Sequence, residues 1–109
     1  MDLHNQKCLI GIKGQIEDSE LPIDIWFNSL KSVASILSKE NRKLLKVIEI
    51  YRPQSLTELA NLTGRAVSNV SRTLKTLEKH GLVTLTANNK SIHVQSNHKE
   101  FLIVVNDEK

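Results

Sequence analysis

Hydrophobic residues recur at helical spacing through the first part and the middle of the chain. One face of the stretch 23–37 carries Trp26, Leu30, Val33 and Leu37, at successive intervals of four, three and four residues. These intervals place the four side chains on one side of a helix. We therefore predict a helix over residues 23–37 with Trp26 in the core. Phe27, about 100° further around that helix, is then a candidate contact for a partner.

Two more helices are predicted from their capping residues. The first begins after Ser38, a favourable N-cap, and runs to about Arg52, where a proline prevents its continuation. Its inward residues are expected to be Leu44, Leu45, Ile48 and Tyr51. The next helix begins at Ser55, because Ser55 and Glu58 have the spacing of a capping box, in which each side chain accepts a hydrogen bond from the other residue's amide.

A fourth helix is predicted over Val67–His80, between the helix breaker Gly64 and the stop residue Gly81. At about 100° per residue, its core face consists of Val67, Val70, Leu74 and Leu77. Two alternating runs follow, at residues 82–86 and 91–95. The intervening "ANNK" suits a tight turn, so the two runs predict a β-hairpin.

Further β-rich runs lie near the two ends of the chain, at residues 7–14 and 101–105. They are expected to pair either with each other or with the same runs of a second chain. The order of the predicted elements indicates an α+β, mainly α fold. More narrowly, it indicates a winged helix-turn-helix with an N-terminal strand and helix and a β-rich C-terminal tail. The expected divisions are 1–22 for the N-terminal strand and link, 23–95 for the winged domain, and 96–109 for the tail.

Positive charge is concentrated in the middle of the chain. The 109 residues carry a net charge of +3, but residues 38–100 hold eleven Lys or Arg against five Asp or Glu, and residues 1–37 hold three against five. A basic segment of this kind favours contact with nucleic acid, because it attracts phosphates.

The fourth predicted helix has a polar face without acids. Opposite its core face, a helical wheel places Arg65, Ser68, Arg72, Lys75 and Lys79, with Asn69, Thr76 and Ser71 at the margins. A face that contacts only solvent ordinarily mixes both signs of charge. Hydroxyl, amide and guanidinium groups near the start of a helix are suited to base edges and phosphates. The pattern therefore predicts binding to double-stranded DNA.

The segment "SLTELANLTGRAVSNVSRTLKTLEKHGLV", residues 55–83, resembles the winged helix-turn-helix regulators of the MarR and ArsR type. The similarity is carried by "ELA", Val70-Ser71-Arg72, Leu74, Leu77 and Gly81-Leu82-Val83. With the flanking "LSKENRKLLKVI" it extends over about residues 36–95. The layout as a whole is similar to small MarR-like DNA-binding proteins, some of which are encoded beside toxins.

The resemblance implies a sequence-specific transcriptional regulator that acts as a repressor. Residues 55–63 would support a recognition helix at Val67–His80, and the hairpin at 82–95 would be the wing. The expected DNA-binding residues are Arg65, Ser68, Asn69, Ser71, Arg72, Lys75 and Lys90. Of these, Asn69 and Arg72 are expected on bases, and Lys90 at the wing tip in a minor groove or on the backbone. Lys79 is expected to contact a phosphate at most.

No cluster in the sequence indicates catalysis, a cofactor or a metal. The four histidines lack a metal-ligand spacing, and Gly11 and Gly14 are not followed by the Gly-Lys-Ser/Thr of a phosphate loop. We therefore expect no enzyme activity, no cofactor and no metal site. The single cysteine, Cys8, excludes an internal disulfide and is expected to be buried. Without a signal-peptide pattern or a ~20-residue apolar run, a cytoplasmic protein with no membrane partner is expected.

The expected partners follow from the size of a DNA site. One winged helix covers one half-site, and tight specific binding commonly uses two. We therefore expect a homodimer, formed by the terminal β-rich runs or by the helix that carries Phe27. One alternative is an antitoxin that neutralises a partner toxin by protein contact and represses its own operon. Another is a winged helix used only for protein contact, in which the basic face binds no DNA.

Overall fold

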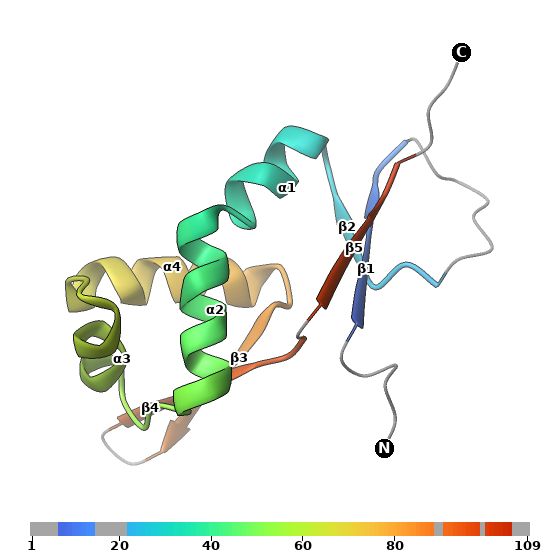
Figure 1. Cartoon of the computed structure of the whole chain (residues 1–109). Helices are drawn as coiled ribbons and strands as arrows, with labels where there is room; N and C mark the ends of the chain where they lie inside the picture. The colour runs from blue at the N-terminus through green and yellow to red at the C-terminus, as the bar shows by residue number, and fades with distance from the viewer. Residues whose placement is uncertain (1–6, 15–21, 89–90, 99, 106–109) are drawn as a thin grey trace. The chain divides into compact units, whose positions relative to one another are not determined.

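The computed structural model describes residues 7–14, 22–88, 91–98 and 100–105. Within these residues the protein has four helices and five strands, which confirms the predicted α+β class (Figure 1). The chain forms two compact units, one from residues 1–36 and 98–109 and the other from residues 37–97. In chain order, the second unit is therefore an insertion within the first.

A three-stranded parallel sheet with the strand order β2-β1-β5 is the basis of the first unit. The central strand β1 (Lys7–Ile12) pairs with β2 (Ile25–Phe27) on one side and with β5 (Glu100–Val104) on the other. Alternate residues of β1, from Cys8 to Ile12, are buried on one face of the sheet. The two β-rich runs near the chain ends therefore pair with each other, which confirms one of the two alternatives.

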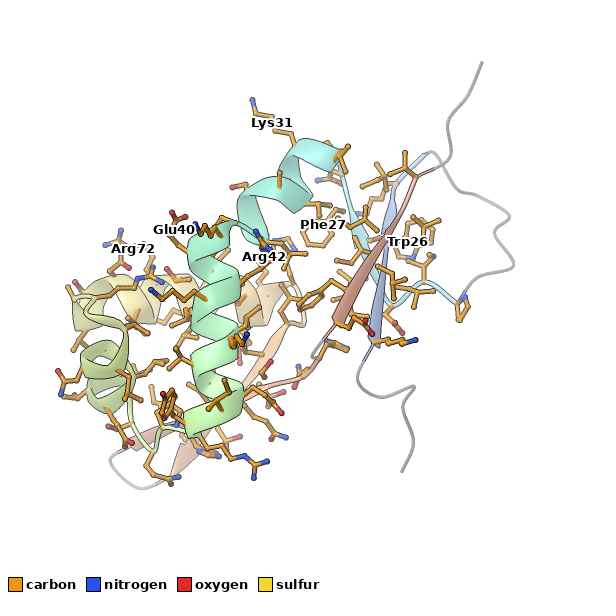
Figure 2. The ribbon with its side chains drawn as sticks, in the orientation of Figure 1. Trp26, Phe27, Lys31, Glu40, Arg42 and Arg72 are labelled. Atoms are coloured by element: carbon orange, nitrogen blue, oxygen red, sulfur yellow. The ribbon has the colours of Figure 1, made fainter. Side chains whose placement is uncertain are left out.

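The predicted helix over residues 23–37 is wrong in its first part. Ile25–Phe27 forms strand β2 in register with β1, and helix α1 occupies only Leu30–Ile36. Consecutive side chains of a strand point to opposite faces. As a result, Trp26 is 40% exposed and Phe27 is 2% exposed, the reverse of the expected roles. Figure 2 shows the two side chains leaving β2 on opposite sides of the sheet.

The 37–97 unit consists of three helices and a hairpin. The helices are α2 (Lys39–Tyr51), α3 (Leu56–Thr63) and α4 (Val67–Lys79), and the hairpin consists of β3 (Val83–Asn88) and β4 (Ser91–Ser96). Antiparallel pairing of β3 and β4 confirms the predicted hairpin. The buried side chains of this unit include Leu44, Leu45, Ile48, Leu59, Ala60, Val70, Leu74, Leu77, Leu82, Val83 and Val94.

Serine caps open α2 and α3 as predicted. The hydroxyl of Ser38 accepts from the amide of Asn41 at 3.2 Å, and the hydroxyl of Ser55 accepts from the amide of Glu58 at 3.1 Å. The second half of the predicted capping box differs by one residue. The Glu58 carboxylate accepts from the amide of Gln54, at 3.1 Å, instead of the amide of Ser55.

Leu30, the first residue of α1, was expected on an inward face but is 52% exposed. Two residues expected in the core of the 37–97 unit also lie at helix ends and are exposed. Tyr51, the last residue of α2, is 61% exposed, and Val67, the first residue of α4, is 43% exposed. Helical periodicity gives the angle of a side chain around its own axis. It does not determine how far along that axis the neighbouring elements reach, and these two side chains extend beyond the packed turns.

The observed division of the chain, after residues 36 and 97, differs from the expected boundaries after residues 22 and 95. Helix α1 groups with the sheet because it packs against β2. None of the helices in the described part of the chain has the length and apolar character needed to cross a membrane.

Candidate nucleic-acid interface

Helix α4 separates a buried apolar face from an exposed polar one. Val70, Leu74 and Leu77 are each 1% exposed or less. The exposed polar residues of the opposite face are Ser68, Asn69, Arg72, Lys75, Thr76 and Lys79, which we call the α4 polar face. Because an α-helix has 3.6 residues per turn, residues three and four apart in the sequence lie on the same face of the helix. In Figure 2 the Arg72 side chain extends away from the α4 ribbon.

The charge of the α4 polar face is entirely positive. Arg72, Lys75 and Lys79 follow one another at intervals of three and four residues, which makes their side chains neighbours on the helix surface. Glu78, the acid of α4, lies at the margin of this face, three residues after Lys75 and about 100° away from Lys79 around the helix axis. Like charges at these spacings repel one another. An anion bound along this face would therefore relieve that repulsion.

The start of α4 leaves backbone donors available. Gly64, with a φ of 69°, ends α3 in the left-handed region, and the amide of Arg65 donates to the carbonyl of Ala60 at 3.1 Å. The N-cap residue of α4 is Ala66, and no side chain caps this helix. The first amides of a helix have no partner within the helix, and together with the helix dipole they favour a phosphate group. This end of α4 differs from the serine-capped starts of α2 and α3.

Arg65 lies along α4 and is held by side chains of the helix. Its Nε donates to Oδ1 of Asn69 at 2.8 Å, and its Nη2 donates to the same oxygen. Nη2 also donates to the hydroxyl of Thr73 at 3.1 Å. Nη1 is buried without a hydrogen-bond partner. The guanidinium group is therefore directed largely at the protein.

The expected DNA-binding residues occupy three kinds of position. Ser68, Arg72 and Lys75 lie on the α4 polar face, and Asn69 lies on it in contact with Arg65. Ser71 is half-buried at the margin of this face. The expected wing-tip residue Lys90 lies outside the described residues, between the strands of the observed hairpin.

Thr73 contacts Arg65, and the sequence analysis did not include it in the site. It is half-buried on the side of α4 next to the polar face, and its hydroxyl accepts from Arg65. The signal for it was present in the sequence, because Arg65, Asn69 and Thr73 are spaced four residues apart and therefore share one line along a helix.

His80, beside Lys79 at the far end of α4, adds little charge near neutral pH. His80 is the C-cap residue, and its pKa is lowered by burial and, to a smaller extent, by the positive charge of Lys79. Among the described residues, no three His, Cys, Asp or Glu side chains come together as metal ligands would. The arrangement around α4 therefore offers hydrogen bonds and positive charge to a ligand.

The segment that carries these features also carries a family signature. Residues 36–101, or 66 of the 109 residues, match the HVO_A0114 family model. The chain belongs to the HVO_A0114 family. In this HVO_A0114 family member the matched segment contains the whole 37–97 unit, including α4 and the hairpin. No curated protein matches the chain.

Proposed function

We propose that this HVO_A0114 family protein is a sequence-specific regulator of transcription that binds double-stranded DNA and represses by occupying an operator. It would act in the cytoplasm, without catalysis and without a cofactor. The observation that carries the proposal is the α4 polar face, which is exposed, rich in hydrogen-bonding groups and free of acids. Guanidinium, amide and hydroxyl groups on one helix face can read base edges and hold phosphates together.

In this proposal the 37–97 unit is a winged helix-turn-helix of the MarR and ArsR kind. Helix α3 supports α4, which lies in a major groove, and the β3–β4 hairpin is the wing. The order of the elements supports this assignment, because a turn at Gly64 separates α3 from α4 and Gly81, with a φ of 80°, leads from α4 toward the hairpin. Ser68, Asn69 and Arg72 in the first half of α4 would then face bases.

Selection of bound duplexes from a random pool tests the proposal directly. We expect one motif to be enriched, with two copies in inverted orientation. Affinity for that motif should fall steeply with salt, with a slope in log–log form of roughly −0.9 for each phosphate that the protein neutralises. A pool that stays random after several rounds, combined with salt-independent weak binding, is incompatible with the proposal. That result would favour a winged helix used only for protein contact.

We also propose that the protein binds its operator as a homodimer formed by the sheet unit. Trp26, Leu102 and Ile103 of this unit are 40–45% exposed. Among the described strands, β5 pairs with β1 alone, so its other edge is open to a second β5. Light scattering should give twice the 12.3 kDa mass of the chain, and Ile103→Lys should shift the mass toward one chain. A monomeric mass for the wild-type protein at micromolar concentration would overturn the dimer.

An antitoxin function is the second candidate, and the same exposed apolar side chains of the sheet unit favour it. In that case these residues would contact a toxin, while the α4 polar face represses the shared operon. Co-expression with the product of an adjacent gene tests this candidate. Growth should be rescued by the wild-type protein and by Arg72→Ala, but not by Trp26→Ala. Rescue that depends on Arg72, or no rescue by the wild-type protein, would contradict it.

A further inference from the structure

Two donors of Arg65 converge on one oxygen atom of Asn69. Nε donates to Oδ1 at 2.8 Å, and Nη2 donates to the same Oδ1. One turn further along α4, the hydroxyl of Thr73 accepts from Nη2 at 3.1 Å. Asn69 is nevertheless an exposed residue of the α4 polar face.

This contact determines which way the Asn69 amide faces. A guanidinium group has five donors and no acceptor, so the atom of Asn69 that meets it must be the carbonyl oxygen and not the NH2 group. An amide oxygen has two lone pairs, and the two donors of Arg65 match that number. What Asn69 presents outward is therefore the Nδ2 amide, which can only donate.

A donating amide distinguishes between bases. An asparagine that reads adenine donates to N7 and accepts from the N6 amino group at the same time. Because Oδ1 already accepts two hydrogen bonds from Arg65, Asn69 cannot accept one from the N6 amino group of adenine. Guanine presents two acceptors in the major groove, N7 and O6, whereas cytosine presents a donor and thymine presents one acceptor beside a methyl group.

We propose that Arg65 is a positioning residue that restricts Asn69 to donating hydrogen bonds, so that α4 selects guanine at one position of the operator. The inference rests on the proposed function and deepens it. It changes the expected role of Arg65, from a direct DNA contact to a residue that acts through its neighbour. Thr73 adds a second acceptor for Nη2, one of the two nitrogens that donate to Asn69.

Hydrogen exchange in the free protein tests the contact without DNA. The Nε–H resonance of Arg65 should exchange with solvent more slowly than that of Arg72, an exposed arginine of the same helix. Asn69→Ala should bring the two exchange rates together. Thr73→Val removes the second acceptor and should accelerate exchange at Arg65 by a smaller factor. Equal exchange at the two arginines of the wild-type protein would overturn the inference.

Duplex selection with variants tests the consequence for base preference. The position at which Asn69→Ala loses its preference identifies the base that Asn69 reads. At that position the wild-type protein should select guanine, and Arg65→Ala should raise the ratio of adenine to guanine on the order of tenfold, because a freed Oδ1 can accept from N6. Lys31→Ala, at an exposed cation of α1 outside the α4 polar face, is the control and should leave the preferred base unchanged. Circular dichroism of each variant checks that α4 is retained.

Three outcomes contradict the inference. If Arg65→Ala weakens all duplexes equally, reduces the salt slope by about one and keeps guanine, then Arg65 is a phosphate contact. If the wild-type protein selects adenine at the Asn69 position, Asn69 is not restricted to donating hydrogen bonds. Each of these results leaves the proposed function standing. If the wild-type protein enriches no duplex at all, the proposed function and this inference fail together.

Discussion

The indole ring of Trp26 covers the backbone of Gly11 on the neighbouring strand. The two residues are register partners in β2 and β1, and a Cβ atom on residue 11 would lie 2.8 Å from Cζ3 and 3.0 Å from Cε3 of the ring. Atoms at these separations overlap. The ring therefore lies where it does because residue 11 has no side chain, and it buries the centre of the sheet on the face opposite Phe27.

Replacing Gly11 with alanine should destabilise the protein by about 1–3 kcal/mol, the usual cost of overpacking. Urea unfolding would measure it. In a Trp26→Leu background the same replacement should cost less, because the contacted ring is gone. A double-mutant cycle gives the coupling between the two sites. Equal costs in both backgrounds would show that the Trp26 contact is not the cause.

Ser55→Ala should reduce the free energy of unfolding by about 1 kcal/mol, because the amide of Glu58 loses its cap. Thermal or urea unfolding would measure the change. Ser35→Ala, at an exposed position within α1, is the matched control and should be neutral or slightly stabilising, since alanine favours helices. Equal effects of the two replacements would argue against a capping role for Ser55.

Arg72→Ala should weaken operator binding by about 1–3 kcal/mol and relax the preference at one base pair, if Arg72 reads a base edge. Titration of the selected duplex and of single-base variants measures both effects. Lys31→Ala, at an exposed cation of α1 (Figure 2), removes the same charge and should leave every base preference unchanged. Unaltered affinity and preference in Arg72→Ala would remove this residue from the interface.

Cys8 should react slowly with alkylating agents in the folded protein. Burial, with a smaller contribution from the negative charge of Asp24, raises the pKa of its thiol from 9.0 to about 11. The thiolate is the reactive form, and two pKa units lower its fraction at pH 8 about a hundredfold. Mass spectrometry after iodoacetamide treatment should show rapid labelling in denaturant and little without it. Comparable rates in both conditions would place Cys8 at the surface.

The stability of the protein should decline as the pH falls below about 6.5. His80 has a lowered pKa in the folded state, so below the unfolded value of 6.5 the unfolded chain binds the proton more readily. The contribution of His80 to the free energy of unfolding therefore rises with pH in that range and reaches its full value above it. His80→Gln should flatten the profile between pH 7 and pH 5 in urea titrations. A steeper profile in the variant would contradict the assigned direction of the shift.

Local signals in the sequence were sufficient for most of the 37–97 unit. The caps at Ser38 and Ser55 and the left-handed glycines at 64 and 81 act through hydrogen bonds and backbone angles within a few residues. The periodicity of Val70, Leu74 and Leu77 predicted the buried face of α4 for the same reason, and with it the residues of the opposite polar face. The errors lie at the ends of these helices: Tyr51 and Val67 are exposed, and the Glu58 carboxylate accepts from the amide of Gln54 instead of Ser55.

The sheet unit depended on tertiary structure. Residues 25–27 are too few to distinguish a period of 3.6 from a period of 2, and their pairing with β1 makes them a strand. Strands β1 and β5 pair although they are about ninety residues apart in the sequence. A local sequence pattern does not indicate which distant segment a strand will pair with.

At the candidate site, the sequence by itself determined which side chains share the α4 polar face, because helical geometry alone sets their angles. The spacing of Arg65, Asn69 and Thr73 permits a contact between them but does not require it, and the structure shows that the Arg65 guanidinium makes this contact. Arg65 precedes the helix, and its direction depends on the turn at Gly64 and on the acceptors that Asn69 and Thr73 offer it. A long flexible side chain takes its position from the acceptors within its reach, and here both acceptors lie on the first two turns of the same helix. Only the tertiary structure decided that residues 25–27 form a strand, because that depends on their pairing with β1.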